Sequence, residues 1–562
     1  MKPFLLYEAH DFNWTRAAPW GHQVLTQDLD LATLLDDMSG NDQYLRDVAA
    51  RVILAGLDDP AAIRYRQRVL RDCLAHPAVI RQLYQLAADT VDGEKKIYHF
   101  AFSNSSTAIL QRSIEVLEFL RGRLQELRVI AETNAAGFAS DGFAALFDML
   151  TDHLSDDYLD AVPDHLNRLR FRSGVLISAQ LGTGNHGRNY VLRTPRFEPS
   201  RWQRFTEEWF TPPHTLVIPE RDDAGGRVLS ELKDRGINLA ANALAQSTDH
   251  VVAFFRSLCA ELAFYVGCVN LHEALTKKRA ELCFPVPGVV QEPDLTAEGL
   301  RDASLVLRLG HPVVGNDVRA AGKSLLVITG ANQGGKSTFL RAIGLALLMM
   351  QSGMFVTARD FRASVSSGLF SHYKREEDTT MTSGKLDEEL GRMSAIVDHL
   401  RPGSTVLLNE SFAATNEREG SEIARQIVHA LTESGVRVLL VTHLFELAQS
   451  LHDEPLDTAL FLRADRRDGG HRTFRIVPGV PFRPATAPTC TRRSSPRSRT
   501  TRPRCSPAHR YQYRCPSPGR FHDAHLRPAG HFVPTPRGRN GRGRRAHRGP
   551  GNARRPPTPG RS

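Results

Sequence analysis

The chain has 562 residues and a formal net charge of +10, but the charge is unevenly distributed. Residues 481–562 hold 20 Arg and a single acidic residue, a net charge of +19, so the first 480 residues carry a net charge of −9. The length excludes a single hydrophobic core and fits about three or four domains. Because the first 480 residues are acidic, the overall positive charge says nothing about what that part of the chain binds.

The sequence has no sign of secretion or of a membrane span. MKPFLLYEAHDF at the N-terminus carries charge soon after its first apolar residues, and no small-residue cleavage site follows. The apolar stretch 339–350 is interrupted by Arg341 and is too short to cross a bilayer. The four cysteines before residue 481 are widely spaced without a CxxC pair, which favours reduced structural cysteines. We expect a cytoplasmic protein that makes no membrane contact.

The first half of the chain has mainly helical periodicity. Between residues 28 and 165, TAILQRSIEVLEFLRGRLQELRVI repeats apolar side chains at spacings of three and four, which predicts amphipathic helices with a buried face. Residues 170–225 differ, because VLISAQL and NYVLRTP predict strands around the turn GTGNHGRN. Helical periodicity resumes over about 235–280. We therefore predict a helical, lever-like region over residues 1–290 with a small β-containing insertion near 170–225.

The second half alternates strands and helices. A linker follows Pro287, and LVLRLGHPVV (305–314) has strand character. The apolar runs LLVI (325–328), TVLLN (405–409) and VRVLLVTH (436–443) then alternate with helical segments. This order predicts a mostly parallel sheet covered on both faces, an α/β domain over residues 291–480.

A phosphate-binding loop lies between the first of these strands and the next helix. The segment GANQGGKST matches GxxxxGK[ST] with a strand before it and a helix after it. Glycines let successive N–H groups face a phosphate, the helix N-terminus adds its positive dipole end, Lys336 reaches the β- and γ-phosphates, and Ser337 can bind Mg²⁺. ATP and Mg²⁺ are therefore the expected cofactors. The expected nucleotide-binding residues are Gly330, Ala331, Asn332, Gln333, Gly334, Gly335, Lys336, Ser337 and Thr338.

Five segments in order resemble the MutS-type DNA mismatch repair ATPases. They are GHPVV with Asn316 and Asp317 after it, TGANQGGKST, SGKLDEELGRMSAIV, LLNES and VTHLFEL, and they extend over about residues 300–450. The resemblance implies DNA as a partner and a homodimer in which a serine of one subunit completes the nucleotide site of the other. Ser383, ahead of Glu388, occupies the corresponding position. The family's N-terminal mismatch-reading domain, with its Phe-x-Glu wedge, is not seen before the helices, so we expect no mismatch reading.

The resemblance also implies roles for the residues at two strand ends. In the family, an Asp at a strand end helps to hold Mg²⁺, the Glu after it polarises the attacking water, and a His at a later strand end senses the γ-phosphate. Glu410 and His443 match the last two, whereas Asn409 replaces the Asp. An amide keeps an oxygen ligand but loses a negative charge, so with Ser337 as the second metal ligand we expect ATP binding with slow hydrolysis. The alternative is a shape-conserving substitution in a fully active site.

The resulting hypothesis is an ATP-dependent DNA-binding protein that couples its nucleotide state to lever movement on duplex or branched DNA, in repair or recombination. One alternative is a nucleotide-gated clamp or scaffold that binds ATP with little hydrolysis. Another is an ABC- or SMC-like ATPase, although neither an LSGGQ-type signature nor a long heptad coiled coil is present. A lever region that binds protein or RNA remains a third alternative, because no groove-reading motif is visible.

The Arg- and Pro-rich tail, residues 481–562, has almost no aliphatic side chains and is predicted to be disordered. It could act as a basic nucleic-acid-binding arm. We prefer a shifted reading frame, because RPATAPTCTRRSS (483–495) can be encoded by DNA that reads TSYGPDLYTKIF in another frame. That peptide resembles the TSYG-containing ending of MutS proteins.

Overall fold

The computed structural model describes residues 1–98, 105–172, 174–193, 218–219, 221–375, 384–413, 415–466 and 472–481. All of them belong to one unit, Met1–Pro488. Ser383 and the tail from residue 482 onward lie outside the described residues. The disorder and the frameshift of the tail therefore stay predictions, as does the division into three domains at residues 290 and 480.

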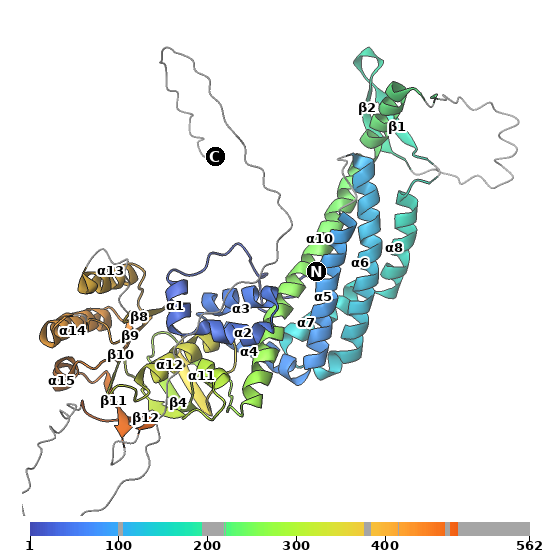
Figure 1. The fold of residues 1–562 in the computed structure, drawn as a ribbon. Coiled ribbons are helices and arrows are strands. Elements are labelled where there is room, and N and C mark those ends of the chain that lie inside the picture. Colours follow the sequence, from blue (N-terminus) through green and yellow to red (C-terminus); the bar gives the residue numbers. More distant parts are fainter. Residues whose placement is uncertain are drawn as a thin grey trace, which may run out of the picture. The chain divides into compact units, whose positions relative to one another are not determined.

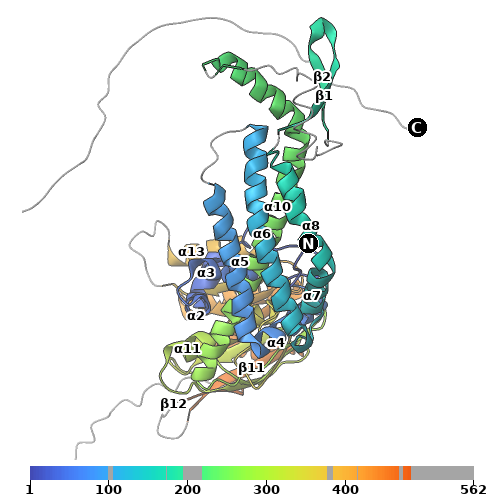
Figure 2. The same cartoon turned by 90° about the vertical axis from the view of Figure 1, so that its right-hand side faces the viewer.

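The described residues of the N-terminal part are mainly helical, with one β-hairpin (Figure 1). Its elements are α1 (His22–Asp28), α2 (Leu31–Ser39), α3 (Gln43–Ala55), α4 (Pro60–Ala75), α5 (Pro77–Tyr98), α6 (Ser106–Asn134), α7 (Asp141–His153), α8 (Asp156–Leu169), β1 (Ile177–Leu181), β2 (Gly187–Leu192) and α10 (Asp223–Lys277), with 3-10 turns at Ala135–Gly137 and Thr183–Asn185. The antiparallel pair β1 and β2 confirms the two predicted strands. Helix α10 lies beside α5 and α6 (Figure 2).

Local sequence explains where these helices begin and which face they bury. Asp42 and Asp59 accept hydrogen bonds from the first N–H groups of α3 and α4, and Pro60 occupies the first position of α4. The apolar stripe predicted on α6 is core. Its members Leu110, Ile114, Leu120, Leu124 and Leu127 are at most 6% exposed.

Helix α10 is the one helix among the described residues that is long and apolar enough, by length and composition alone, to cross a membrane. The apolar stretch 339–350 lies in α12 instead. The most apolar window of α10 is 78% buried inside the protein. Its apolar side chains are therefore used in the core, as in other long core helices.

The C-terminal part contains two sheets. Its elements are β3 (Val286–Gly288), β4 (Leu295–Leu300), α11 (Ala303–Arg308), β5 (Asn316–Arg319), β6 (Leu325–Thr329), α12 (Lys336–Gln351), β7 (Asp360–Ser364), β8 (Leu369–Tyr373), α13 (Lys385–Val397), β9 (Thr405–Asn409), α14 (Glu417–Glu433), β10 (Arg437–Val441), α15 (Phe445–Asp453), β11 (Ala459–Arg466) and β12 (Arg472–Pro478). The larger sheet has the order β12-β11-β6-β10-β9-β8, and only β12 is antiparallel to its neighbour. The smaller sheet has the order β3-β7-β4-β5.

Alternate residues of the central strands face two different hydrophobic clusters. Leu326 and Ile328 of β6 lie in the cluster that contains α12. Leu325 and Val327 lie in the cluster that contains α14 and α15. Because successive side chains of a strand point to opposite faces, helices cover both faces of the sheet, which confirms the predicted α/β architecture.

The strand character assigned to LVLRLGHPVV is wrong. Residues 303–308 form helix α11, and the next strand begins only at Asn316. Asp302 caps α11, because its carboxylate accepts a hydrogen bond from the N–H of Leu305 at 3.0 Å. The same carboxylate binds Arg341 of α12 at 2.5 Å and is almost fully buried, so tertiary contacts override the strand propensity of the segment.

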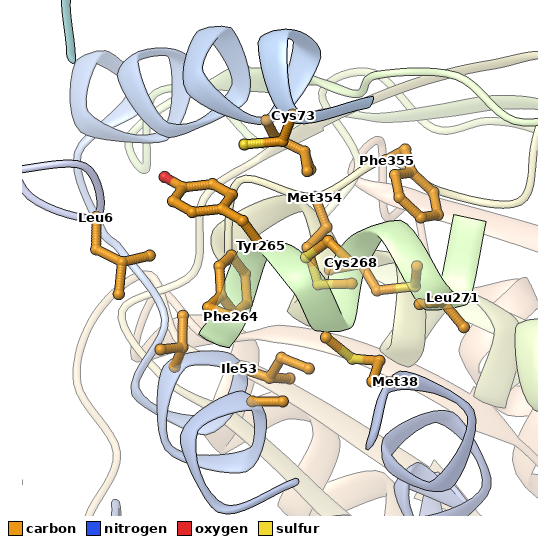
Figure 3. Close-up of a cluster of buried hydrophobic side chains, with 14 of the residues drawn as sticks. Leu6, Met38, Ile53, Cys73, Phe264, Tyr265, Cys268, Leu271, Met354 and Phe355 are labelled. Atoms are coloured by element: carbon orange, nitrogen blue, oxygen red, sulfur yellow. The ribbon is translucent and has the colours of Figure 1, made fainter. Parts of the chain in front are cut away.

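The helical part and the sheets share one core. Figure 3 shows Phe264 and Tyr265 of α10 beside Leu6 of the N-terminal segment and Met354 from the chain after α12. Arg66 of α4 joins the same parts by donating hydrogen bonds to the carbonyls of Leu6 and Ser352 at 3.1 and 3.2 Å. The four cysteines of the described residues are free, and three of them are buried. They contribute to packing, as predicted.

Candidate nucleotide-binding site

The phosphate loop leaves the fully buried strand β6 and enters helix α12. Three of its residues have left-handed backbones, Gly330 (φ 116°), Gln333 (φ 60°) and Gly335 (φ 93°). A Cβ at Gly330 or Gly334 would lie 3.0 or 2.8 Å from the Cβ of Ala464 on β11. The glycines therefore permit both the curled backbone and the close approach of β11, which the motif alone does not indicate.

Lys336 occupies the first turn of α12 and is only 4% exposed. Its ammonium donates hydrogen bonds to the carbonyls of Gly330 and Ala331 at 2.8 and 3.2 Å. Burial lowers the pKa of Lys336, and the nearby carboxylate of Glu410 opposes this effect. The cation is thus held over the loop, in the position from which a lysine contacts phosphate oxygens.

The two oxygens proposed for Mg²⁺ lie in direct contact. Asn409 is the last residue of β9, and β10 separates it from β6 in the sheet. Because parallel strands end at the same edge, Asn409 nevertheless reaches the start of α12. The hydroxyl of Ser337 donates a hydrogen bond to the Asn409 Oδ1 at 2.9 Å. A hydroxyl and an amide oxygen are hard ligands that suit Mg²⁺, so the residues fit the ion.

Glu410 and His443 also meet at this edge. The Glu410 Oε2 lies 3.8 Å from the His443 Nδ1, beyond hydrogen-bond distance, and the two side chains are 27% and 39% exposed. Glu410 has a left-handed backbone with φ 55°, and its N–H donates to the carbonyl of Val441 on β10 at 2.8 Å. The polar groups predicted on three separate segments are therefore brought together. The predicted role of Ser383 stays a prediction.

A group of four buried side chains lies next to the turn that carries Glu410. His372 of β8, Glu389 of α13, and Ser411 and Phe412 of the loop after Glu410 are all at most 2% exposed. Burial, with Arg392 and Arg375 adding to it, lowers the pKa of His372 to about 4, so the ring is neutral at pH 7. Burial also raises the pKa of Glu389. Glu389 and Ser411 fall inside the segments SGKLDEELGRMSAIV and LLNES, but neither segment indicates that they meet. Only the tertiary structure brings the four residues together.

A cavity of about 590 Å³ opens beside the phosphate loop. It lies between Gly330 and Asn332 of the loop, His443, and the end of β11 at Arg463 and Arg466. Asn316 helps to hold this edge, because its amide accepts a hydrogen bond from the N–H of Ile476 at 2.7 Å and donates one to the carbonyl of Phe474 at 3.3 Å. The phosphate loop is therefore lined by β11 and β12, which lie beyond the last recognised motif.

A second polar feature lies on the β1–β2 hairpin and the end of α8. Residues 165–197 contain six Arg and no Lys, Asp or Glu. Arg168, Arg172, Arg188 and Arg193 are exposed, and the ion pairs of the described residues include none to these four. The first 480 residues are acidic as a whole, so only a count over a short window reveals this basic cluster.

The phosphate loop and its parallel sheet define an α/β P-loop nucleotide-binding domain. The family model described as MutS domain V matches residues 326–475, and the one described as MutS2 N-terminal domain matches residues 58–278. The chain belongs to the MutS-related family.

Individual relatives match parts of the chain. Endonuclease MutS2 of Lacticaseibacillus casei (strain BL23) is 32% identical over 232 residues, which are 40% of this chain and 29% of that protein. DNA mismatch repair protein MutS of Synechococcus sp. (strain CC9902) is 26% identical over 369 residues, 62% of this chain and 40% of that protein. MutS of Chloroflexus aurantiacus (strain ATCC 29366 / DSM 635 / J-10-fl) is 32% identical over 166 residues, 29% of this chain and 17% of that protein. The matches thus span well under two thirds of each relative.

Proposed function

We propose that this protein binds ATP with Mg²⁺ at the phosphate loop, hydrolyses it slowly, and uses its nucleotide state to move the helical region on DNA as a homodimer. The observation that carries the proposal is the 2.9 Å contact between Ser337 and Asn409, next to the buried Lys336. It unites at one sheet edge the two hard oxygen ligands and the cation that the bound nucleotide requires.

Each side chain has a distinct role in this proposal. The N–H groups of the loop and of the first turn of α12 bind phosphate oxygens, and Lys336 turns from the loop carbonyls toward the β- and γ-phosphates. Ser337 and Asn409 would hold Mg²⁺, which would supply positive charge to neutralise the phosphates. Glu410 accepts a proton from the attacking water, and His443 contacts the terminal phosphate.

The arginine cluster supports DNA as the partner of the helical region. Exposed guanidinium groups without a carboxylate partner are free to contact phosphates, and such contacts supply most of the sequence-independent affinity for DNA. The cluster lies mainly on and around a β-hairpin and not on a helix that could read bases in the major groove. We therefore expect recognition of DNA form or backbone rather than of base sequence.

Fluorescence anisotropy with homoduplex, mismatched, branched and single-stranded DNA tests the proposal. Affinity should change with ATP, ADP or a non-hydrolysable analogue, and it should fall with salt. Changing Arg172, Arg188 and Arg193 together to Gln should weaken binding to every DNA form and reduce the salt slope by about 1 for each phosphate that is no longer bound. Changing Arg123, Arg227 and Arg308 to Gln is a matched control. Absence of DNA binding in every nucleotide state would contradict the DNA proposal.

A nucleotide-gated clamp with little hydrolysis is the second candidate. Asn409 favours it, because the missing negative charge weakens the hold on Mg²⁺ while the phosphate loop remains complete. Steady-state phosphate release with and without DNA separates the two candidates. Stable ATP binding without release, in both conditions, would select the clamp.

A further inference from the structure

The turn that carries Glu410 has an unusual backbone. Two of its residues, Glu410 (φ 55°) and Phe412 (φ 62°), are left-handed although neither is glycine. A side chain makes this conformation unfavourable, so contacts from the surrounding structure must hold it. The position of the Glu410 carboxylate depends on this turn, since it fixes the direction in which the side chain leaves the main chain.

Glu389 of α13 makes the principal contact from outside the turn. Its Oε2 accepts a hydrogen bond from the N–H of Phe412 at 2.7 Å, and the side chain is 1% exposed. Its other oxygen, Oε1, is buried without a hydrogen-bond partner among the described residues. Helix α14 also approaches the turn closely, because a Cβ at Gly420 would lie 2.4 Å from the Phe412 carbonyl oxygen. Two helices therefore contact the turn.

His372 joins β8 to the same turn. Its Nε2 lies 3.1 Å from the carbonyl of Glu389, which can only accept, so the neutral ring carries its proton there. Its Nδ1 lies 2.8 Å from the Ser411 hydroxyl. The same hydroxyl lies 2.7 Å from the His372 carbonyl, so its single hydrogen is shared between these two acceptors. The ring stacks on Phe412 with centroids 5.4 Å apart. Strand, helix and turn therefore form one hydrogen-bonded unit.

We propose that Glu389 is a positioning residue for ATP hydrolysis, which holds the Glu410 turn through the Phe412 N–H, with His372 and Ser411 completing the contact. This inference rests on the proposed function, because it concerns the same hydrolysis. The hydrogen bond between Glu389 and Phe412 couples α13 to the Glu410 turn. A displacement of α13 should therefore change the rate of hydrolysis without changing the phosphate loop. Glu389 is not one of the residues proposed to contact the nucleotide or the attacking water, and in this proposal it acts through Glu410.

Three variants of the full chain separate positioning from general damage. Glu389→Leu replaces the hydrogen-bond acceptor by an apolar side chain of similar size. Glu389→Gln keeps an acceptor oxygen and should rescue. Asp387→Leu, which removes an exposed acidic residue on the same helix, is the matched control. The ATP dissociation constant, the single-turnover rate of hydrolysis of bound ATP, and the unfolding temperature are measured for each.

The expected result is a split between binding and hydrolysis. Glu389→Leu should bind ATP within about 3-fold of the unmodified chain and hydrolyse it 10- to 100-fold more slowly, because a misplacement of about 1 Å costs a reaction up to about 100-fold. Glu389→Gln and Asp387→Leu should stay within about 3-fold in both measurements. Glu389→Leu at the unmodified rate would overturn the inference, as would an equal loss of binding and hydrolysis.

Two further outcomes keep the test decisive. If Glu389→Leu does not fold, Ser411→Ala decides, since unchanged hydrolysis in that variant would overturn the inference and a slower rate with unchanged ATP binding would support it. If the unmodified chain does not bind ATP, the proposed function fails, independently of Glu389. If it binds ATP and never hydrolyses it, the positioning role is overturned and the clamp alternative stands.

Discussion

Restoring a carboxylate at Asn409 is the most direct test of the nucleotide site. Asn409→Asp adds one negative charge at the end of β9, where the side-chain oxygen already lies 2.9 Å from the Ser337 hydroxyl. The shape of the side chain is kept, so the change isolates the charge. Glu410→Gln, one residue further, removes the proposed base and spares the metal ligands. The two substitutions therefore separate metal holding from water activation.

The magnitude follows from electrostatics at a half-buried position. Two unit charges 4 Å apart interact by about 4 kcal/mol at an effective dielectric of about 20. The phosphates already neutralise much of the Mg²⁺ charge, and a carboxylate gives up hydration when it binds. A net gain of about 1.5–3 kcal/mol is therefore expected, which lowers the Mg²⁺ concentration for half-maximal activity by about 10- to 100-fold.

The assay is phosphate release at saturating ATP over a Mg²⁺ titration. Asn409→Asp should shift the titration to lower Mg²⁺ and raise kcat, whereas Glu410→Gln should retain bound ATP and stop release. Asn416→Asp is the control, because it makes the same kind of change at the N-cap of α14, where Asn416 accepts a hydrogen bond from the N–H of Glu419. If Asn409→Asp changes neither rate nor Mg²⁺ dependence while Glu410→Gln stops turnover, the asparagine is a tolerated replacement and the reasoning is refuted.

Four other outcomes are expected. Lys336→Ala should reduce ATP binding below detection in an equilibrium assay while the control Lys323→Ala, at the other end of β6, leaves it intact; full affinity in Lys336→Ala would contradict the phosphate-loop assignment. Ser383→Ala should bind ATP normally but lose turnover or ATP-driven dimer closure, and mixtures with Lys336→Ala should show complementation between subunits if the site is composite. Burial raises the pKa of Glu261 to about 7, so the folded chain binds a proton more tightly than the unfolded chain and the free energy of unfolding should fall as pH rises from about 4.5 to 7, by at most about 3 kcal/mol. Glu261→Gln should remove this pH dependence in denaturant titrations, and an unchanged slope would exclude Glu261 as its source. Sequencing the gene around codon 483 should reveal a missing or extra base, and a confirmed frame that yields a protease-resistant tail would contradict the frameshift.

The contacts around the buried carboxylate of Glu261 explain why that pH effect belongs to folding. Its Oε2 accepts hydrogen bonds from the N–H groups of Leu5 and Leu6 at 2.6 and 3.2 Å. Tyr265, one turn further along α10, donates to the carbonyl of Leu5 at 2.6 Å. These contacts tie the N-terminal segment to α10, so a charge on Glu261 is stabilised by two N–H groups but remains buried away from water.

The sequence by itself determined the elements whose signals are local. The phosphate loop could be identified because its glycines, lysine and serine are contiguous, and because each acts through the backbone beside it. Strands β6, β9 and β10 are continuous apolar runs, as buried parallel strands require, and helix α6 carries its apolar stripe at helical spacing. These features depend on neighbours within a few residues, so the chain order alone contains the information.

Only the tertiary structure decided the features that join distant residues. Helix α11 forms in a segment with strand character, and its capping residue Asp302 is held in place by Arg341 of α12, 39 positions away. Ala464, more than 100 positions further along the chain, leaves no room for a side chain at Gly330 and Gly334. Glu389 accepts a hydrogen bond from the N–H of Phe412 in the turn after β9. No local pattern records such contacts, because burial and hydrogen-bond partners are set by which surfaces meet after folding.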